Sequence, residues 1–187
     1  MDERVGRATF DAQGWAKRMR TPLPDWHQWQ GWTNNCGPFS AAIVANALLD
    51  AHVADGTLVA ESMNASAIPE RIPDWATFPW GVIRALRRMA VRARWRAVVP
   101  ESRLLRNLDA GRTTIVMVGE PLRFEGWKYK GWGHYKVLYA WDPVKGWAFV
   151  DPAAPRSRVY SYQDAATFRR QWTWLGRQVI EVLGHTA

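Results

Sequence analysis

The chain has 187 residues with 48% hydrophobic and 22% charged composition and a formal charge of +8, as is typical of one globular domain with a real core. It contains no run of 18 or more apolar residues and no apolar block after its charged N-terminus, so we expect no membrane span, no secretory signal and a cytoplasmic protein. A single cysteine cannot form an internal disulfide, and with only four histidines a metal site is not expected. We also expect no organic cofactor.

The first half of the chain is predicted to be mainly helical. The clearest helix covers 37–51, because Pro38 suits a first turn and apolar residues recur at a helical spacing. Other predicted helices cover 2–20 (a possible N-terminal extension), 80–93 and 101–110. Segments 21–33 and 56–79 contain several prolines and glycines and are expected to be irregular, the second with short helical pieces, whereas 95–99 reads as a strand.

The second half of the chain changes to β character. Strands are predicted over 113–118, 135–141, 147–150, 158–162 and 178–183. A turn is expected over 142–146 and a short helix over 163–172. Helices followed by strands favour an α+β fold with an antiparallel sheet. We therefore expect one domain over 1–187, in which 21–112 is the mainly helical half and 113–187 the mainly β half.

The only cysteine, Cys36, lies where an irregular loop gives way to the predicted helix. Unpaired backbone N–H groups at a helix N-terminus stabilise a thiolate, which is the nucleophilic form of cysteine. Gly37 beside it carries no side chain, which would let a substrate carbonyl approach the sulfur. The alternative is that Cys36 is simply a small buried hydrophobic residue.

Three further residues could assist Cys36 in acyl transfer. Gln30 lies six positions earlier, where its amide could donate to an oxyanion together with the backbone N–H of Cys36. His134 follows a Gly-Trp-Gly segment and opens a predicted strand, so it could face a cleft as the base. Asp151 ends the next strand and could orient the imidazole. A simple hairpin register places Asp151 near Val137, so a bulge or a one-residue slip is needed to bring it to the histidine.

A family resemblance rests on these motifs taken together: Gln30, Cys-Gly-Pro at 36–38, His-Tyr-Lys-Val-Leu at 134–138 and Asp-Pro at 151–152. Over about 30–172 the chain resembles the papain-like cysteine peptidases of the bacteriocin-processing, double-glycine leader type and their stand-alone relatives. The resemblance implies a papain-like fold, in which a helical lobe carrying the cysteine packs on an antiparallel β-sheet lobe carrying the histidine. It implies the following roles: nucleophile, Cys36; base, His134; orienting acid, Asp151; oxyanion donor, Gln30.

These observations favour a thiol hydrolase that cleaves a peptide or isopeptide bond of a peptide or protein substrate through an acyl-enzyme. The residues expected to bind that substrate lie next to the motifs and are Trp32, Asn35, Gly37, Trp132 and Gly133. An acyltransferase or transglutaminase-like enzyme would use the same thiol, and the sequence leaves that alternative open.

A non-catalytic alternative rests on a basic stretch of sequence. Its six arginines are Arg84, Arg87, Arg88, Arg92, Arg94 and Arg96. Such a surface could bind nucleic acid or anionic lipid. No nucleic-acid motif accompanies it, and a charge-rich face is more often only solvated, so nucleic acid is not the expected partner. The oligomeric state stays open.

Overall fold

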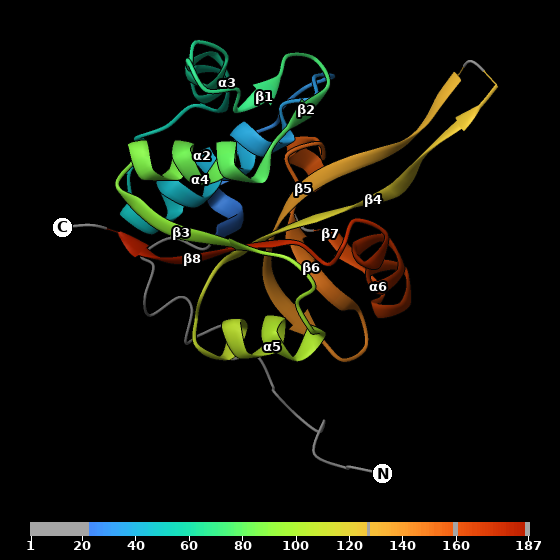
Figure 1. Cartoon of the computed structure of the whole chain (residues 1–187). Coiled ribbons are helices and arrows are strands. Elements are labelled where there is room, and N and C mark those ends of the chain that lie inside the picture. The colour runs from blue at the N-terminus through green and yellow to red at the C-terminus, as the bar shows by residue number, and fades with distance from the viewer. Residues whose placement is uncertain (1–22, 127, 159–160, 186–187) are drawn as a thin grey trace.

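In the part of the chain that the structure describes, a sheet of six strands crosses the molecule and carries helices on both of its faces (Figure 1). The structure is a computed structural model that describes residues 23–126, 128–158 and 161–185. The strands are β3 (Val91–Arg96), β4 (Thr114–Glu125), β5 (Lys128–Asp142), β6 (Gly146–Val150), β7 (Ser161–Gln163) and β8 (Val179–His185). Their order across the sheet is β3-β8-β4-β5-β6-β7, and each neighbouring pair runs antiparallel. A separate ribbon pairs β1 (Arg71–Ile72) with β2 (Ala76–Thr77).

The helices fall into two groups, one on each face of the sheet. In chain order they are η2 (Leu23–Trp26), α2 (Cys36–Leu49), α3 (Gly56–Asn64), α4 (Pro79–Arg88), α5 (Glu101–Asp109), η3 (Arg156–Arg158) and α6 (Ala165–Trp174). In Figure 1, α2, α3 and α4 gather on one side of the sheet, whereas α5 and α6 lie on the other. Every residue of α2 from Cys36 to Ala47 is buried, so α2 is an internal helix, as its mainly apolar composition favours.

Two hydrophobic cores form because successive residues of a strand point to opposite faces of the sheet. Ile115, Val137 and Ile180 face the core that contains α2 and α4. Their chain neighbours Val116, Leu138 and Val179 face the other core, where aromatic side chains of β6 and α6 pack with the leucines of α5. The central strands are therefore apolar on both faces, and helices cover them on both sides.

The β4–β5 hairpin extends well beyond the rest of the sheet. β8 pairs with β4 only at Thr114–Val116, and β6 pairs with β5 only from Val137 to Asp142. Past those positions β4 and β5 pair with each other alone and project from the body of the molecule (Figure 1). His134, paired with Val118, lies at the base of this arm.

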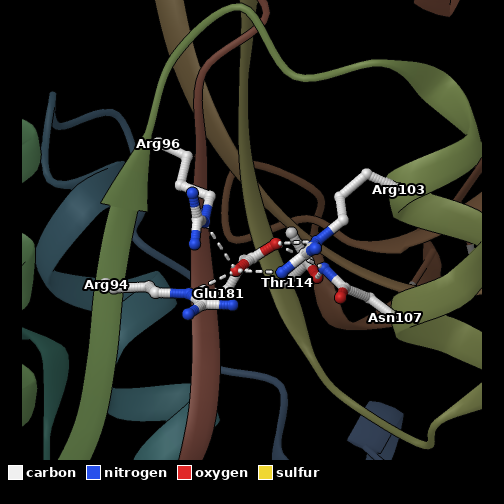
Figure 2. Close-up of polar contacts among 6 residues, drawn as sticks. All are labelled: Arg94, Arg96, Arg103, Asn107, Thr114 and Glu181. Atoms are coloured by element: carbon white, nitrogen blue, oxygen red, sulfur yellow. Dashed lines mark hydrogen bonds and ion pairs between the residues drawn. The ribbon is translucent and has the colours of Figure 1, made fainter.

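A buried carboxylate fastens the edge of the sheet to α5. Glu181 of β8 is 1% exposed and accepts hydrogen bonds from Arg94 and Arg96 of β3 at 2.6 and 3.2 Å (Figure 2). From α5, Arg103 donates to it at 2.7 Å and Asn107 at 3.2 Å. Burial raises the pKa of Glu181, but the hydrogen bonds and charges of these arginines outweigh burial and lower it to about 2.

Glu70, a second buried carboxylate, joins the start of the β1–β2 ribbon to α4. It is fully buried and accepts hydrogen bonds from Arg84 and Arg88 at 2.7 to 2.8 Å. Most arginines of the predicted basic stretch are thus engaged with buried carboxylates. This structural role weakens the interpretation of that stretch as a surface for a polyanion.

The α+β architecture with an antiparallel sheet is confirmed, and several predicted boundaries are corrected. The helix predicted over 80–93 ends at Arg88, and β3 begins at Val91, because Ala90 turns the chain with a φ of 58°. The predicted strand 95–99 is therefore the end of β3 followed by a loop. Segment 56–79 contains α3, in agreement with the predicted short helical pieces, and the side chain of Asp55 caps the N-terminus of that helix. The β1–β2 ribbon in the same segment was not predicted.

Other predictions are tested only in part. The predicted helix 2–20 lies outside the described residues. The predicted strand 158–162 corresponds to β7, which the structure places at Ser161–Gln163. No helix in the described residues has the length and apolarity that a membrane crossing requires.

Candidate active site

Cys36 is the first residue of α2, and its thiol is adapted to ionise. The residue is only 8% exposed, and burial by itself raises the pKa of a thiol. A hydrogen bond with His134, the charge of that ring, and backbone hydrogen bonds from Tyr135 and Gly37 lower the pKa by more. The net effect is a Cys36 pKa below the ordinary value, which favours the thiolate at the positive end of the helix.

His134 lies inside β5 rather than at its start, which corrects the prediction that it opens a strand. The Gly-Trp-Gly segment before it is part of the strand, and its Gly133 pairs with Gly119 of β4. A Cβ on Gly119 would collide with the carbonyl of Trp132, so the two strands can approach here only because of that glycine. This close approach holds together the β4–β5 hairpin, from which the His134 imidazole reaches Cys36.

The imidazole lies between a thiol and a carboxylate. Its Nε2 is 2.6 Å from Oδ1 of Asp151, so the hydrogen bond with Cys36 falls to Nδ1. Burial lowers the pKa of His134, but the hydrogen bonds and negative charges of Asp151 and Cys36 raise it to about 9. At neutral pH the imidazole of His134 is therefore mainly in its charged form, next to the Asp151 carboxylate and to a thiol whose pKa is lowered.

Asp151 reaches the histidine through an irregularity in the β5–β6 pairing. The register shifts between Leu138 and Ala140, so that Val137 pairs with Val150. If this register continues by one residue, Asp151 lies beside Lys136 rather than Val137. This is the one-residue slip expected from the sequence. Burial raises the pKa of Asp151, but the hydrogen bond and charge of His134, with a contribution from Lys136, hold it well below its usual range.

The loop before Cys36 holds the backbone that carries Asp151. The Nε2 of His27 is 2.9 Å from the carbonyl oxygen of Asp151, and because a carbonyl only accepts, the imidazole donates. The backbone N–H of Gln30 donates to the carbonyl of Pro152 at 2.9 Å. The segment from the helical half of the chain thus fixes the position of an acid from the β half.

Gln30 lines the same cavity as Cys36 and His134. Its side-chain Nε2 donates to the carbonyl of Thr33 at 2.5 Å, which uses one of its two hydrogens. Its Oε1 is buried and makes no hydrogen bond with any residue that the structure describes. The amide therefore shares a cavity with the thiol and has one hydrogen without a partner among the described residues, and its role as an oxyanion donor stays a prediction.

A cavity of about 450 Å³ opens over the thiol. Trp75 and Thr77 line it from the β1–β2 ribbon, and Met117 and Trp132 line it from the β4–β5 hairpin. Among the described residues that line it, His134 is the only ionisable side chain apart from Cys36 and Tyr135, whose pKa burial raises far above its usual range. The cavity is thus lined by aromatic, aliphatic and uncharged polar side chains around Cys36 and His134.

The five residues expected to bind substrate are distributed unevenly. Trp132 and Gly133 line the cavity, whereas Trp32 is 99% exposed and Asn35 lies outside the lining. The Oδ1 of Asn35 instead accepts a hydrogen bond from Arg71 at 2.7 Å.

The structure explains the glycine at position 37 by packing and not by the expected access of substrate to the sulfur. A Cβ at this position would lie 2.7 Å from the Cβ of Thr77, so the space beside the sulfur is filled by that side chain. Gly37 allows β2 to pack against the start of α2 and does not leave an opening for substrate.

Several residues of the site were not identified from the sequence. Trp75 and Thr77 of the β1–β2 ribbon, Met117 of β4 and Leu175 after α6 come from three separate segments, and no local pattern connects them with Cys36. Lys136 had a usable signal, because it lies two residues after His134 and so leaves the same face of β5. Its Nζ is 3.0 Å from Oδ2 of Asp151.

A larger cavity, of about 730 Å³, lies elsewhere and is lined by Trp26, His27 and His52 among others. It contains neither Cys36 nor His134, so we assign the chemistry to the smaller cavity. No cluster of His, Cys, Asp and Glu suited to a metal ion occurs within the described ranges.

Comparison with solved structures gives a match for the fold. A protein of Bacillus anthracis, whose assignment as a C39-like peptidase is itself provisional, superposes with a TM-score of 0.61 at 12% identity, over 82% of this chain and 90% of that chain. A variant of the Salmonella effector SpvD gives a TM-score of 0.44 at 12% identity, over 88% and 77% of the two chains, which is too low to argue from. No family model and no curated protein matches the sequence. The chain thus has a cysteine peptidase-like fold, and at this identity the likeness extends no further.

Proposed function

We propose that the protein is a thiol hydrolase of the papain-like type that cleaves a peptide or isopeptide bond through an acyl-enzyme. The observation that carries the proposal is the continuous chain from the Cys36 thiol through the His134 imidazole to Asp151, with a 2.6 Å contact at its second link. A thiol of lowered pKa, a charged imidazole and a fixed carboxylate are the three parts that acyl transfer to sulfur needs. The cysteine peptidase-like fold supports the same reaction class.

In the first half-reaction the Cys36 thiolate attacks the carbonyl carbon and forms a carbon–sulfur bond. The carbonyl π electrons move to oxygen, where the backbone N–H of Cys36 and the free hydrogen of the Gln30 amide would stabilise the oxyanion. When the oxyanion collapses, the carbon–nitrogen bond breaks and His134 gives its Nδ1 proton to the departing amine. The acyl group is left as a thioester on Cys36.

In the second half-reaction neutral His134 takes a proton from water, and the hydroxide equivalent attacks the thioester. The carbon–sulfur bond then breaks, which releases a carboxylic acid and restores the thiolate. Asp151 holds the Nε2–H of the ring throughout, so Nδ1 always points to the sulfur.

The lining of the cavity points to an uncharged section of substrate. Trp132 of the hairpin and Trp75 of the ribbon are about half exposed, and both line the space over the thiol. Indole rings bury large apolar area at low entropic cost. We expect a substrate that places apolar groups beside the scissile bond, and the double-glycine specificity of the resembled family remains a hypothesis for this chain.

Replacing the nucleophile tests the proposal. Cys36→Ala should abolish turnover of a peptide substrate selected from a library, while circular dichroism and thermal unfolding stay close to those of the parent protein. In the parent protein, acid quenching during turnover should trap an acyl adduct whose mass maps to Cys36. Activity retained by Cys36→Ala would end the proposal.

The same assay separates hydrolysis from acyl transfer. With a primary amine added in excess, a hydrolase still releases mainly the free acid, whereas an acyltransferase forms the amide. Mass spectrometry of the products distinguishes the two, and predominant amide formation would replace hydrolysis by transfer at the same thiol.

A further inference from the structure

Lys136 occupies a position that a surface lysine does not. It leaves the same face of β5 as His134, two residues away, and its Nζ lies 3.0 Å from Oδ2 of Asp151. The side chains of Lys136 and Asp151 are only 15% and 12% exposed. The Lys136 ammonium also lies 5.6 Å from the centre of the Phe149 ring. Ion pairs with little solvent contact are screened weakly, so this one acts strongly on its neighbours.

Lys136 and His134 share the Asp151 carboxylate. Oδ1 accepts from His134 and from the backbone N–H of Ala153 at 2.9 Å, which leaves Oδ2 to Lys136. Rotation of the carboxylate would break contacts at both oxygens. The lysine therefore fixes which oxygen faces the imidazole.

Resting on the proposed function, we propose that Lys136 is a positioning residue that holds Asp151 for His134 and sets the pH range in which the Cys36–His134 pair is charged. Lys136 does not line the cavity over the thiol, so it acts on substrate only through Asp151 and His134.

The direction of the effect follows from the sign of the charge. A fixed positive charge stabilises a neighbouring anion and destabilises a neighbouring cation. Lys136 thus opposes the pull of Asp151 on the imidazolium and favours the thiolate of Cys36. Its removal should raise the pKa of both His134 and Cys36, and the active pH range should move upward.

Other charged and titratable groups near the site stay in place in such a variant. His27 faces Asp151 from the segment after η2, and its imidazole donates to the backbone carbonyl. Arg71 of β1 interacts electrostatically with Cys36 at the start of α2. Tyr135, which lies on β5 like Lys136, also interacts electrostatically with Cys36. A difference between variants at position 136 therefore reports the lysine itself.

The test compares Lys136→Met, which removes the charge at similar length, with Lys136→Arg, which keeps it. Both are assayed for peptide turnover and for alkylation of Cys36 by iodoacetamide across pH. In Lys136→Met both limbs of the profile should move up by about 0.5–1 pH unit, and kcat should fall about tenfold with KM nearly unchanged. Lys136→Arg should restore the parent limbs and most of kcat.

Lys145→Met is the matched control. Lys145 also lies over an aromatic ring, 5.2 Å from the centre of Tyr162, but it belongs to the β5–β6 turn and makes no ion pair among the described residues. Its profile should match the parent protein. If Lys136→Met does not fold, Lys136→Gln carries the same test, because its amide can still donate to Oδ2 without a charge.

The outcomes separate the two proposals. The role of Lys136 would be overturned if the limbs of the pH profile coincide in the parent protein and in Lys136→Met. It would also be overturned if Lys136→Arg folds but keeps the shifted limbs. A parent protein whose thiol titrates as a free thiol would overturn the proposed function instead.

Discussion

Asp151 gives each of its two carboxylate oxygens a different task. One oxygen meets the His134 imidazole at 2.6 Å, and the other meets the Lys136 ammonium at 3.0 Å. A carboxylate with two cationic partners stays ionised despite its burial, which is why its pKa lies far below the ordinary range. An ionised Asp151 in turn keeps the ring of His134 protonated and oriented.

Asp151→Asn should therefore change the pH profile as well as the rate. The amide keeps the shape of the carboxylate but loses its charge, so the pKa of His134 should fall from about 9 toward the ordinary 6.5. The imidazolium needed to protonate the leaving amine is then scarce at neutral pH. We expect kcat to fall on the order of 100-fold and the alkaline limb of kcat/KM to move to lower pH.

Asp142→Asn is the control for that variant. Asp142 is also followed by proline, but its Oδ1 caps the β5–β6 turn by accepting from the backbone N–H groups of Val144 and Lys145 at 2.8 Å. The turn variant should keep the parent pH profile. An unchanged alkaline limb in Asp151→Asn would contradict the assigned role of Asp151.

At the scale of elements, Glu181 joins three of them at one buried point. It lies on β8, and its arginine partners come from β3 and α5 (Figure 2). Its pKa is lowered to about 2 by those partners, so the stabilisation is present above the unfolded value of 4.5 and is lost as the pH falls toward 2. The cluster stabilises the edge of the sheet, and none of its residues lines the cavity over Cys36.

Glu181→Gln should destabilise the fold without changing the chemistry. Breaking a buried ion pair costs about 3–5 kcal/mol, and because the arginine heads are partly exposed we expect about 2 kcal/mol here. Urea unfolding at pH 7 measures the loss, and kcat of the folded variant should equal that of the parent protein. The control is Glu101→Gln, since the exposed Glu101–Arg169 pair at 2.8 Å is worth less than about 1 kcal/mol. Equal stabilities for the two variants would contradict the assigned role of Glu181.

Elements with a strong local pattern were predictable, and those set by distant contacts were not. The apolar run after Cys36 predicted α2, and the alternation around Val137 predicted the core of β5. The end of α4 was missed because Met89 and Ala93 continue the helical spacing of its apolar residues by coincidence, whereas Val91 and Ala93 alternate as buried residues of β3. The lengths of β4 and β5 were underestimated in the prediction. Their outer residues pair only with each other, and the local sequence carries no strong signal for that pairing.

At the scale of the whole molecule, the candidate site exists only where the two halves of the chain meet. Cys36 belongs to a helix of the first half, whereas in the second half His134 belongs to β5 and Asp151 directly follows β6. Sequence order could identify these three residues by their chemistry and their surroundings. The cavity could not be predicted, because Trp75, Met117 and the rest of its lining converge only after folding.

Because the thiol is lowered in pKa by partners about a hundred residues away, its ionisation is a property of the folded molecule. An unfolded chain has a thiol of ordinary pKa, about 8.5, and the chain contains a single cysteine, so alkylation reports one site. The most direct measurement is the rate of iodoacetamide alkylation of Cys36 against pH, in the native protein and in urea. We predict a native midpoint clearly below the unfolded one, and below that of His134→Gln. A native midpoint that coincides with the unfolded value would contradict the thiolate–imidazolium pair.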